Sequence, residues 1–139
     1  LISMVFYVKS LEAKQDAPFK IFAVMSYHAE YQWQQQLKEG IESVLGNICD
    51  VRYFDLDTKR NPAEGHKKAE EAYAIYKTWR PDGVIASDDN AQSMFVVPYL
   101  KDKVSTPVIF CGVNADPQKY GYPTVNVQVF WNVIIYESL

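Results

Sequence analysis

Three short polar segments contain the residues of this sequence best suited to bind a small molecule. They are Ser26-Tyr27-His28, Asp88-Asp89-Asn90 and Gly112-Val113-Asn114. Two adjacent aspartates followed by an asparagine offer more acceptors than the single one that a helix cap needs. An acceptor-rich turn suits a ligand with amine or hydroxyl donors, because a buried donor that loses its partner costs about 1–3 kcal/mol. We therefore interpret the three segments as a candidate binding site.

Each of these residues also has a structural explanation. Ser26, Asn90 or either aspartate could cap a helix, and for one such residue taken alone capping explains its type well. His28 fits a solvated loop, and Trp33 could pack in the core as well as stack on a ligand. Capping does not explain two aspartates and an asparagine at one turn, and this favours binding.

Catalytic chemistry has less support in the sequence. It contains no GxSxG elbow, no GxxxxGK[ST] phosphate loop and no GxGxxG turn after the first predicted strand. Asp57, Asp88 and Asp89 could together hold Mg²⁺, although no spacing requires it. The only histidines are His28 and His66, and we expect His66 on a charged helix surface. We predict no catalytic residue, metal or cofactor, and keep a hydrolase or metal-dependent enzyme as an alternative.

The stretches between the polar segments predict the elements that position them. From Phe19 onward, short apolar runs alternate with amphipathic stretches, a pattern typical of βαβ units and a parallel sheet. The predicted strands are residues 21–25, 51–54, 84–86 and 106–113. The predicted helices are residues 33–45, 62–79 and 91–97. Ligands bind at the carboxyl ends of the strands in such a sheet. The first two segments and Asn114 of the third each follow a predicted strand, so we expect them to meet.

Local signals set the ends of these elements. Asn61 is expected to cap the second helix, with Pro62 at its first position and Glu64 as the capping-box acid. Pro98 is expected to end the third helix. Strand 51–54 is less apolar and is placed nearer an edge. The fold class is therefore α/β, a three-layer open parallel sheet with helices on both faces.

Composition limits the classes of protein to consider. The chain has 139 residues, 48% hydrophobic and 22% charged, which fits one ordinary globular domain. Its net charge of -3 and scattered basic residues lack the basic stripe of nucleic-acid binding, so we predict no nucleic-acid partner. Cys49 and Cys111 are expected to be core thiols, and a disulfide between them stays open in an oxidising compartment.

The first 18 residues suggest export. Residues 1–8 are apolar but too few to span a bilayer, and a polar stretch follows up to Pro18. We interpret residues 1–18 as the remnant of a signal peptide or leader and residues 19–139 as a ligand-binding lobe without a transmembrane span. A first strand or a disordered leader is the alternative. The expected location is periplasmic or extracytoplasmic, secreted or membrane-anchored.

The polar segments and their flanks resemble the substrate-binding proteins of ABC transporters, relatives of the type I periplasmic binding proteins. The resemblance covers about residues 20–126 and is specific as a set. Its segments are residues 26–28, Trp33, 53–60, 80–91, 97–99, 110–114, 116–117 and 120–122.

This resemblance implies a flavodoxin-like amino-terminal lobe, over which a second lobe closes when a small-molecule solute binds. The implied partner is an ABC permease, or a signalling region where the same module serves as a membrane-bound sensor. The residues implied to bind the solute are Ser26, Tyr27, Trp33, Asp88, Asp89, Asn90 and Asn114.

The resemblance ends after Asn126. There the family pattern leads us to expect V-T-G-V-L-E-R-H-H-Y, but the chain reads V-Q-V-F-W-N-V-I-I-Y over residues 127–136. One base lost near the start of this stretch and one gained near its end would convert the first into the second. We therefore hypothesise a local double frameshift, which resequencing of the gene tests. If residues 128–135 are genuine, their apolar run predicts a strand of the sheet or an exposed, adhesive apolar segment.

Overall fold

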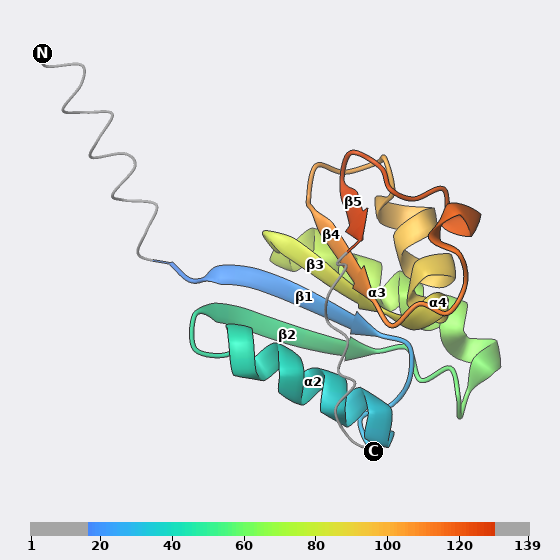
Figure 1. Cartoon of the computed structure of the whole chain (residues 1–139), viewed down its shortest axis with the longest axis horizontal. Coiled ribbons are helices and arrows are strands. Elements are labelled where there is room, and N and C mark those ends of the chain that lie inside the picture. Colours follow the sequence, from blue (N-terminus) through green and yellow to red (C-terminus); the bar gives the residue numbers. More distant parts are fainter. Residues whose placement is uncertain (1–16, 130–139) are drawn as a thin grey trace, which may run out of the picture.

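Five parallel strands form the central sheet, in the order β2-β1-β3-β4-β5 (Figure 1). The computed structural model describes residues 17–129. The strands are β1 (Phe19–Met25), β2 (Cys49–Asp55), β3 (Gly83–Ser87), β4 (Val108–Cys111) and β5 (Val127–Val129). The predicted parallel α/β sheet is confirmed, and β2 lies at an edge as its sequence indicates.

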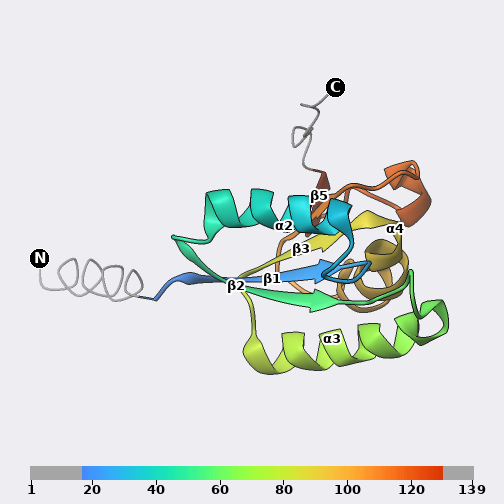
Figure 2. The same ribbon diagram turned by 90° about the horizontal axis from the view of Figure 1, so that it is seen from below.

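Helices cover both faces of the sheet, which confirms the predicted three layers. Helix α2 (Gln32–Leu45) and helix α3 (Gly65–Trp79) lie on opposite faces (Figure 2). After β3, the short helix α4 (Asp88–Ala91) continues into the π-helix η2 (Gln92–Leu100), which packs against α3. Two 3-10 turns, η1 and η3, span Pro62–Glu64 and Pro117–Tyr120.

The main core fills the space between the sheet and the layer of α3 and η2. Phe22 of β1 is at its centre, with its ring centroid 6.2 Å from Phe95 and 6.4 Å from Trp79. Val24, Val108 and other buried side chains complete this core. The carboxyl-terminal half of β1, residues 22–25, is buried on both faces, as expected for a central strand of a covered parallel sheet. This packing holds the carboxyl end of β1 rigidly between its neighbours.

The predicted end of the third helix at Pro98 is wrong. Helical backbone begins at Asp88 and runs through Pro98 to Leu100. Proline disturbs an α-helix because its ring meets the carbonyl four residues earlier and it has no N–H to donate. In the wider π-helical turn the hydrogen bonds span five residues, as in the bond from Lys101 N to Val96 O, so a proline is accommodated.

The predicted capping of the second helix is also wrong in detail. Asn61 makes no side-chain cap, and Pro62 and Glu64 form a 3-10 turn before α3 begins at Gly65. The Asn61 amide instead donates to Asp57 Oδ2 at 2.8 Å. This hydrogen bond to a carboxylate orients the Asn61 side chain towards Asp57, and its oxygen accepts no N–H of the turn that follows.

The two cysteines are half-buried and free, so the expectation of core thiols is correct only in part. Cys49 begins β2 and Cys111 ends β4, at opposite ends of strands that have two others between them. This separation is incompatible with the disulfide left open above. Burial raises the pKa of the Cys111 thiol to about 11.

Strand β5 adds a fifth member to the sheet at the point where the resemblance ends. Its residues 127–129 pair with β4 in parallel register, as the strand prediction for this run requires. Residues 130–135 of that run, like residues 1–16 of the expected leader, lie outside the described residues. No helix in the described part of the chain is both long and apolar enough to cross a bilayer.

Candidate functional site

The three polar segments meet at the carboxyl edge of the sheet. The chain leaves β1 towards β2 on one side and leaves β3 towards β4 on the other, so the order of strands reverses between β1 and β3. In open parallel sheets this switch point is the preferred place for ligands. Residues 26–28 follow β1, residues 88–90 follow β3, and residues 112–114 follow β4. The juxtaposition expected from the sequence is present.

Ser26 links β1 to the helix that follows β3. Its side chain is fully buried, and its Oγ donates to Ser87 O at 2.7 Å and accepts from Ala91 N at 2.9 Å. Ser87 O is the carbonyl four residues before Ala91 N, so the Ser26 hydroxyl bridges the donor and the acceptor of the first turn of α4. Ser26 therefore fixes the end of β1 against the end of β3 and the start of α4.

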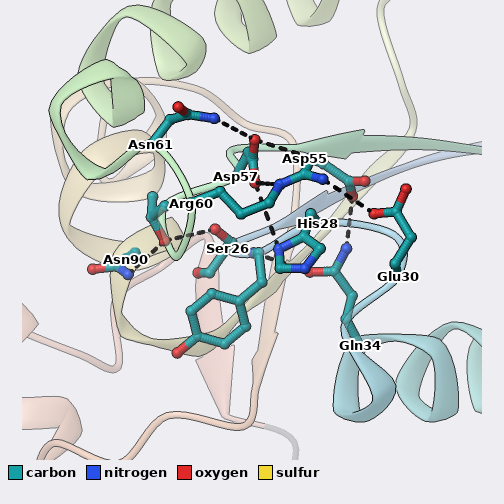
Figure 3. A network of polar contacts seen from close by, with 11 residues as sticks. Ser26, His28, Glu30, Gln34, Asp55, Asp57, Arg60, Asn61 and Asn90 are labelled. Carbon is teal, nitrogen blue, oxygen red and sulfur yellow. Dashed lines mark hydrogen bonds and ion pairs between the residues drawn. The ribbon is translucent and has the colours of Figure 1, made fainter.

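Asn90 extends this link to the loop after β2. Its Nδ2 donates to Thr58 Oγ1 at 2.8 Å, and the same hydroxyl donates to Ser26 O at 2.7 Å (Figure 3). Thr58 is buried, and sequence reasoning did not select it. The one sequence signal for Thr58 is its place directly after Asp55-Leu56-Asp57, at the carboxyl end of a predicted strand.

Asp89 holds the loop after β4 in place. Its carboxylate accepts from Tyr120 Oη at 2.6 Å, from Asn114 N at 3.0 Å and from Ala115 N at 3.3 Å. Burial opposes ionisation, but these donated hydrogen bonds outweigh it and lower the pKa of Asp89. The carboxylate of Asp89 is thus fully engaged within the chain.

Asp88, its neighbour, is placed differently. It is 4% exposed and has a φ of 67°, a left-handed conformation that is uncommon outside glycine. Its Oδ1 accepts from Asn114 Nδ2 at 3.4 Å, a long hydrogen bond. Burial, and after it hydrogen bonding of the Tyr27 hydroxyl to the Asp88 carboxylate, raises the pKa of that hydroxyl. Asp88 therefore faces Tyr27 and Asn114 with weak pairing.

Aromatic rings lie beside these acids. Tyr27 is in edge-to-face contact with Tyr31 and Trp33, at centroid distances of 5.1 and 6.0 Å. A Cβ atom added to Gly112 would meet the Trp33 ring at 2.6 Å, and Gly112 has a φ of 65°. Trp33 is therefore packed on the backbone at the end of β4, and it joins α2 to the site. Tyr31 was not predicted as a site residue.

A charged cluster stands at the end of β2 (Figure 3). Arg60 donates to both carboxylate oxygens of Asp57, at 2.8 and 3.1 Å, and these bonds lower the pKa of Asp57. Glu30 Oε2 lies 3.5 Å from the Arg60 guanidinium, and His28 Nδ1 lies 3.5 Å from Asp57 Oδ1. His28 is only 17% exposed, so it is not the solvated loop residue that we considered.

This cluster removes Asp57 from the magnesium site considered above. Both of its oxygens are engaged by Arg60 and Asn61. Within residues 17–129, no three His, Cys, Asp or Glu side chains form a group that could hold a metal ion. The structure therefore does not bring Asp57 together with Asp88 and Asp89.

Gln34 is a buried positioning residue that sequence reasoning missed. It is 3% exposed, its Oε1 accepts from Tyr27 N at 2.9 Å, and its Nε2 donates to Asp55 Oδ1 at 2.8 Å. Burial raises the pKa of Asp55, although the Gln34 hydrogen bond opposes that shift. Gln34 thereby fixes the backbone of Tyr27. A glutamine in an amphipathic helix is normally expected on the exposed face, so no sequence signal distinguishes Gln34 from Gln35 or Gln36.

A small pocket lies beside Gln34, between α2 and the strands beneath it. Its volume of about 40 Å³ accommodates a water molecule rather than a solute. Its lining residues are Met25, Ala29, Gln34, Gln35, Lys38, Tyr53 and Asp55.

Comparisons of this chain with protein-family models, with curated proteins and with solved structures found no match.

Proposed function

We propose that this chain is a ligand-binding lobe of an extracytoplasmic solute-binding protein that serves an ABC importer. One observation carries the proposal. Residues 26–28, 88–90 and 112–114, which belong to three different strand ends, converge at the switch point of an open parallel sheet. Ligands of such sheets bind at this position, because loops and helix amino-termini present polar groups there.

The polar groups at this edge favour binding over covalent catalysis. A serine nucleophile needs an exposed hydroxyl with a base in hydrogen-bond reach. Ser26 is fully buried, and its hydroxyl bonds to the backbone of Ser87 and Ala91. The rings of Tyr27 and Trp33 instead offer the apolar and aromatic surface that solute sites combine with a few polar groups.

A single lobe contributes one side of such a site. In the two-lobed arrangement that the resemblance implies, the solute contacts this edge first and the second lobe then closes over it. A membrane-bound sensor would use the same edge for the same binding step. Genes for a permease and an ATPase beside this one support import, whereas a kinase or cyclase region in the same reading frame supports sensing.

A thermal-shift screen of the full chain tests the proposal. The compounds are amino acids, nucleosides, sugars and small amines. A ligand present at about 100 times its dissociation constant stabilises the folded state by about 2.7 kcal/mol, which raises the unfolding temperature measurably. We expect at least one class to stabilise the chain. Absence of stabilisation by every class, at concentrations up to the millimolar range, overturns the proposal.

A further inference from the structure

The two adjacent aspartates of the site differ in how fully they are paired. Asp89 accepts three hydrogen bonds, at 2.6, 3.0 and 3.3 Å. Asp88 has a long contact of 3.4 Å with Asn114 Nδ2, and the Tyr27 hydroxyl is the other donor that it faces. Yet Asp88 is the more buried of the two, at 4% exposure. The better buried carboxylate therefore has the poorer pairing.

A buried carboxylate normally has a cation beside it, because removing a charge from water without a partner is costly. Among residues 17–129, the ion pairs involve other acids and none reaches Asp88. The Asn114 side chain that approaches it is exposed and held by a long bond. A stronger donor from outside the chain can take the place of this amide.

The rings next to Asp88 favour the same type of charge. Lys59 Nζ lies 4.8 Å from the centroid of the Tyr27 ring and 4.4 Å from that of Tyr31. Aromatic faces attract cations through the negative potential of the ring. These rings therefore already have a cation of the chain beside them, and within residues 17–129 Lys59 is exposed and forms no ion pair. Trp33 adds a third ring, 6.0 Å from Tyr27.

We propose that the solute carries a cationic amine or quaternary ammonium group, and that this group binds between the Asp88 carboxylate and the rings of Tyr27 and Trp33. This inference rests on the proposed function, because it names the ligand class of the same edge. Asp88 supplies the charge that pairs with the cation, and the rings exclude water from the pair. A sugar or an anionic solute would leave the Asp88 carboxylate without a counter-charge.

Three pairs of cations and neutral analogues of similar size test the inference on the full chain. They are choline and 3,3-dimethylbutan-1-ol, phenethylamine and 2-phenylethanol, and putrescine and butane-1,4-diol. Dissociation constants come from titrations followed by two-dimensional proton–nitrogen NMR, which detects millimolar binding. We expect at least one cation to bind at least about tenfold more tightly than its neutral partner, as a charged hydrogen bond implies.

Two substitutions identify the groups involved. Asp88→Asn should weaken that cation at least about tenfold and leave the neutral analogue unchanged. Asparagine tolerates a left-handed backbone, so the fold is expected to be retained, and the NMR spectrum reports this. Asp102→Asn is the matched control, because Asp102 is exposed, also has a positive φ of 56° and lies beside Asn126, at the amino end of β4 and not at the carboxyl edge.

Lys59→Met removes the cation that the chain places on the rings. We expect it to strengthen binding of the favoured cation about two- to fivefold, because a competing cation–π contact is lost. Weaker cation binding in this variant contradicts the inference. So does Asp88→Asn binding the cation as tightly as the unchanged chain.

The outcomes separate the inference from the proposed function. If sugars or nucleosides bind while no cation exceeds its neutral analogue, the ligand class is wrong and solute binding stands. If no compound of any class binds, both are overturned.

Discussion

The hydroxyl oxygen of Ser26, directly after β1, accepts a hydrogen bond at 2.9 Å from the backbone N–H of Ala91, in the helix that follows β3. The same hydroxyl donates to Ser87 O at 2.7 Å. One buried side chain therefore fixes the two strand ends that flank the switch point. The position of Asp88 and Asp89, which stand between Ser87 and Ala91, depends on this link.

Replacing Ser26 with alanine should lower the free energy of unfolding by about 1–3 kcal/mol, because buried polar groups of Ser87 and Ala91 lose their partner. Urea denaturation measures the change. Ser43→Ala is the control, since its hydroxyl bonds to Gly40 O on the exposed side of α2 and its loss should cost within about 0.5 kcal/mol. Equal losses of unfolding free energy in the two variants would show that the buried hydrogen bonds of Ser26 stabilise the fold no more than an exposed one does.

Replacing Gln34 with methionine should cost a similar free energy of unfolding, about 1–3 kcal/mol, because Tyr27 N and Asp55 Oδ1 both lose a buried partner. The neighbouring Gln36→Met is the matched control, as Gln36 is exposed on the same helix. Denaturation of both variants in urea decides between them. A Gln34 variant as stable as the control would contradict the positioning role.

Acid should destabilise the chain in part through Asp89. The pKa of Asp89 is lower in the folded chain than in the unfolded one, so its contribution is present above the ordinary aspartate pKa of about 3.9 and disappears as the pH falls through the folded value. The free energy of unfolding of Asp89→Asn should therefore fall less steeply below about pH 4 than that of the unchanged chain. Asp102→Asn, which removes an exposed carboxylate, is the comparison for the loss of one charge. An unaltered slope in Asp89→Asn would refute this assignment.

Gly112 and Gly121 both have a positive φ, of 65° and 71°, but differ in what a side chain would meet. Alanine at either position should cost about 1–2 kcal/mol of stability from the left-handed backbone alone. At Gly112 the new methyl group also meets the Trp33 ring at 2.6 Å, whereas at Gly121 it meets the flexible end of Lys101. Only Gly112→Ala should shift the indole N–H resonance of Trp33. A shift of that resonance in Gly121→Ala, or none in Gly112→Ala, would contradict the packing described.

The order of elements and the place of the polar segments follow from short-range patterns, so the sequence predicts them well. Apolar runs mark β1 to β4, and the rule that loops at carboxyl ends meet places residues 26, 88 and 114 together. These features need no knowledge of individual partners.

The division of roles within the site depends on contacts between distant residues. Asp88 and Asp89 are indistinguishable in the sequence, and only the fold shows that Tyr120 and the loop at Asn114 pair with one of them. Gln34 lies on a helix rich in glutamine, so its burial was not predictable. Asn61 was assigned to a cap for a different reason: its partner Asp57 is only four residues away, but the conformation of the intervening turn, which decides the contact, has no clear pattern in the sequence.

The most direct test of solute binding at the carboxyl edge is the location of the contact. A titration of the isotope-labelled full chain with the best-bound compound, followed by two-dimensional proton–nitrogen NMR, gives this location residue by residue. We predict that the largest changes occur at Tyr27, Asp88, Asn114 and the Trp33 indole. Changes concentrated at the opposite end of the sheet, near Phe19 and Ile48, would contradict the assignment of the binding site.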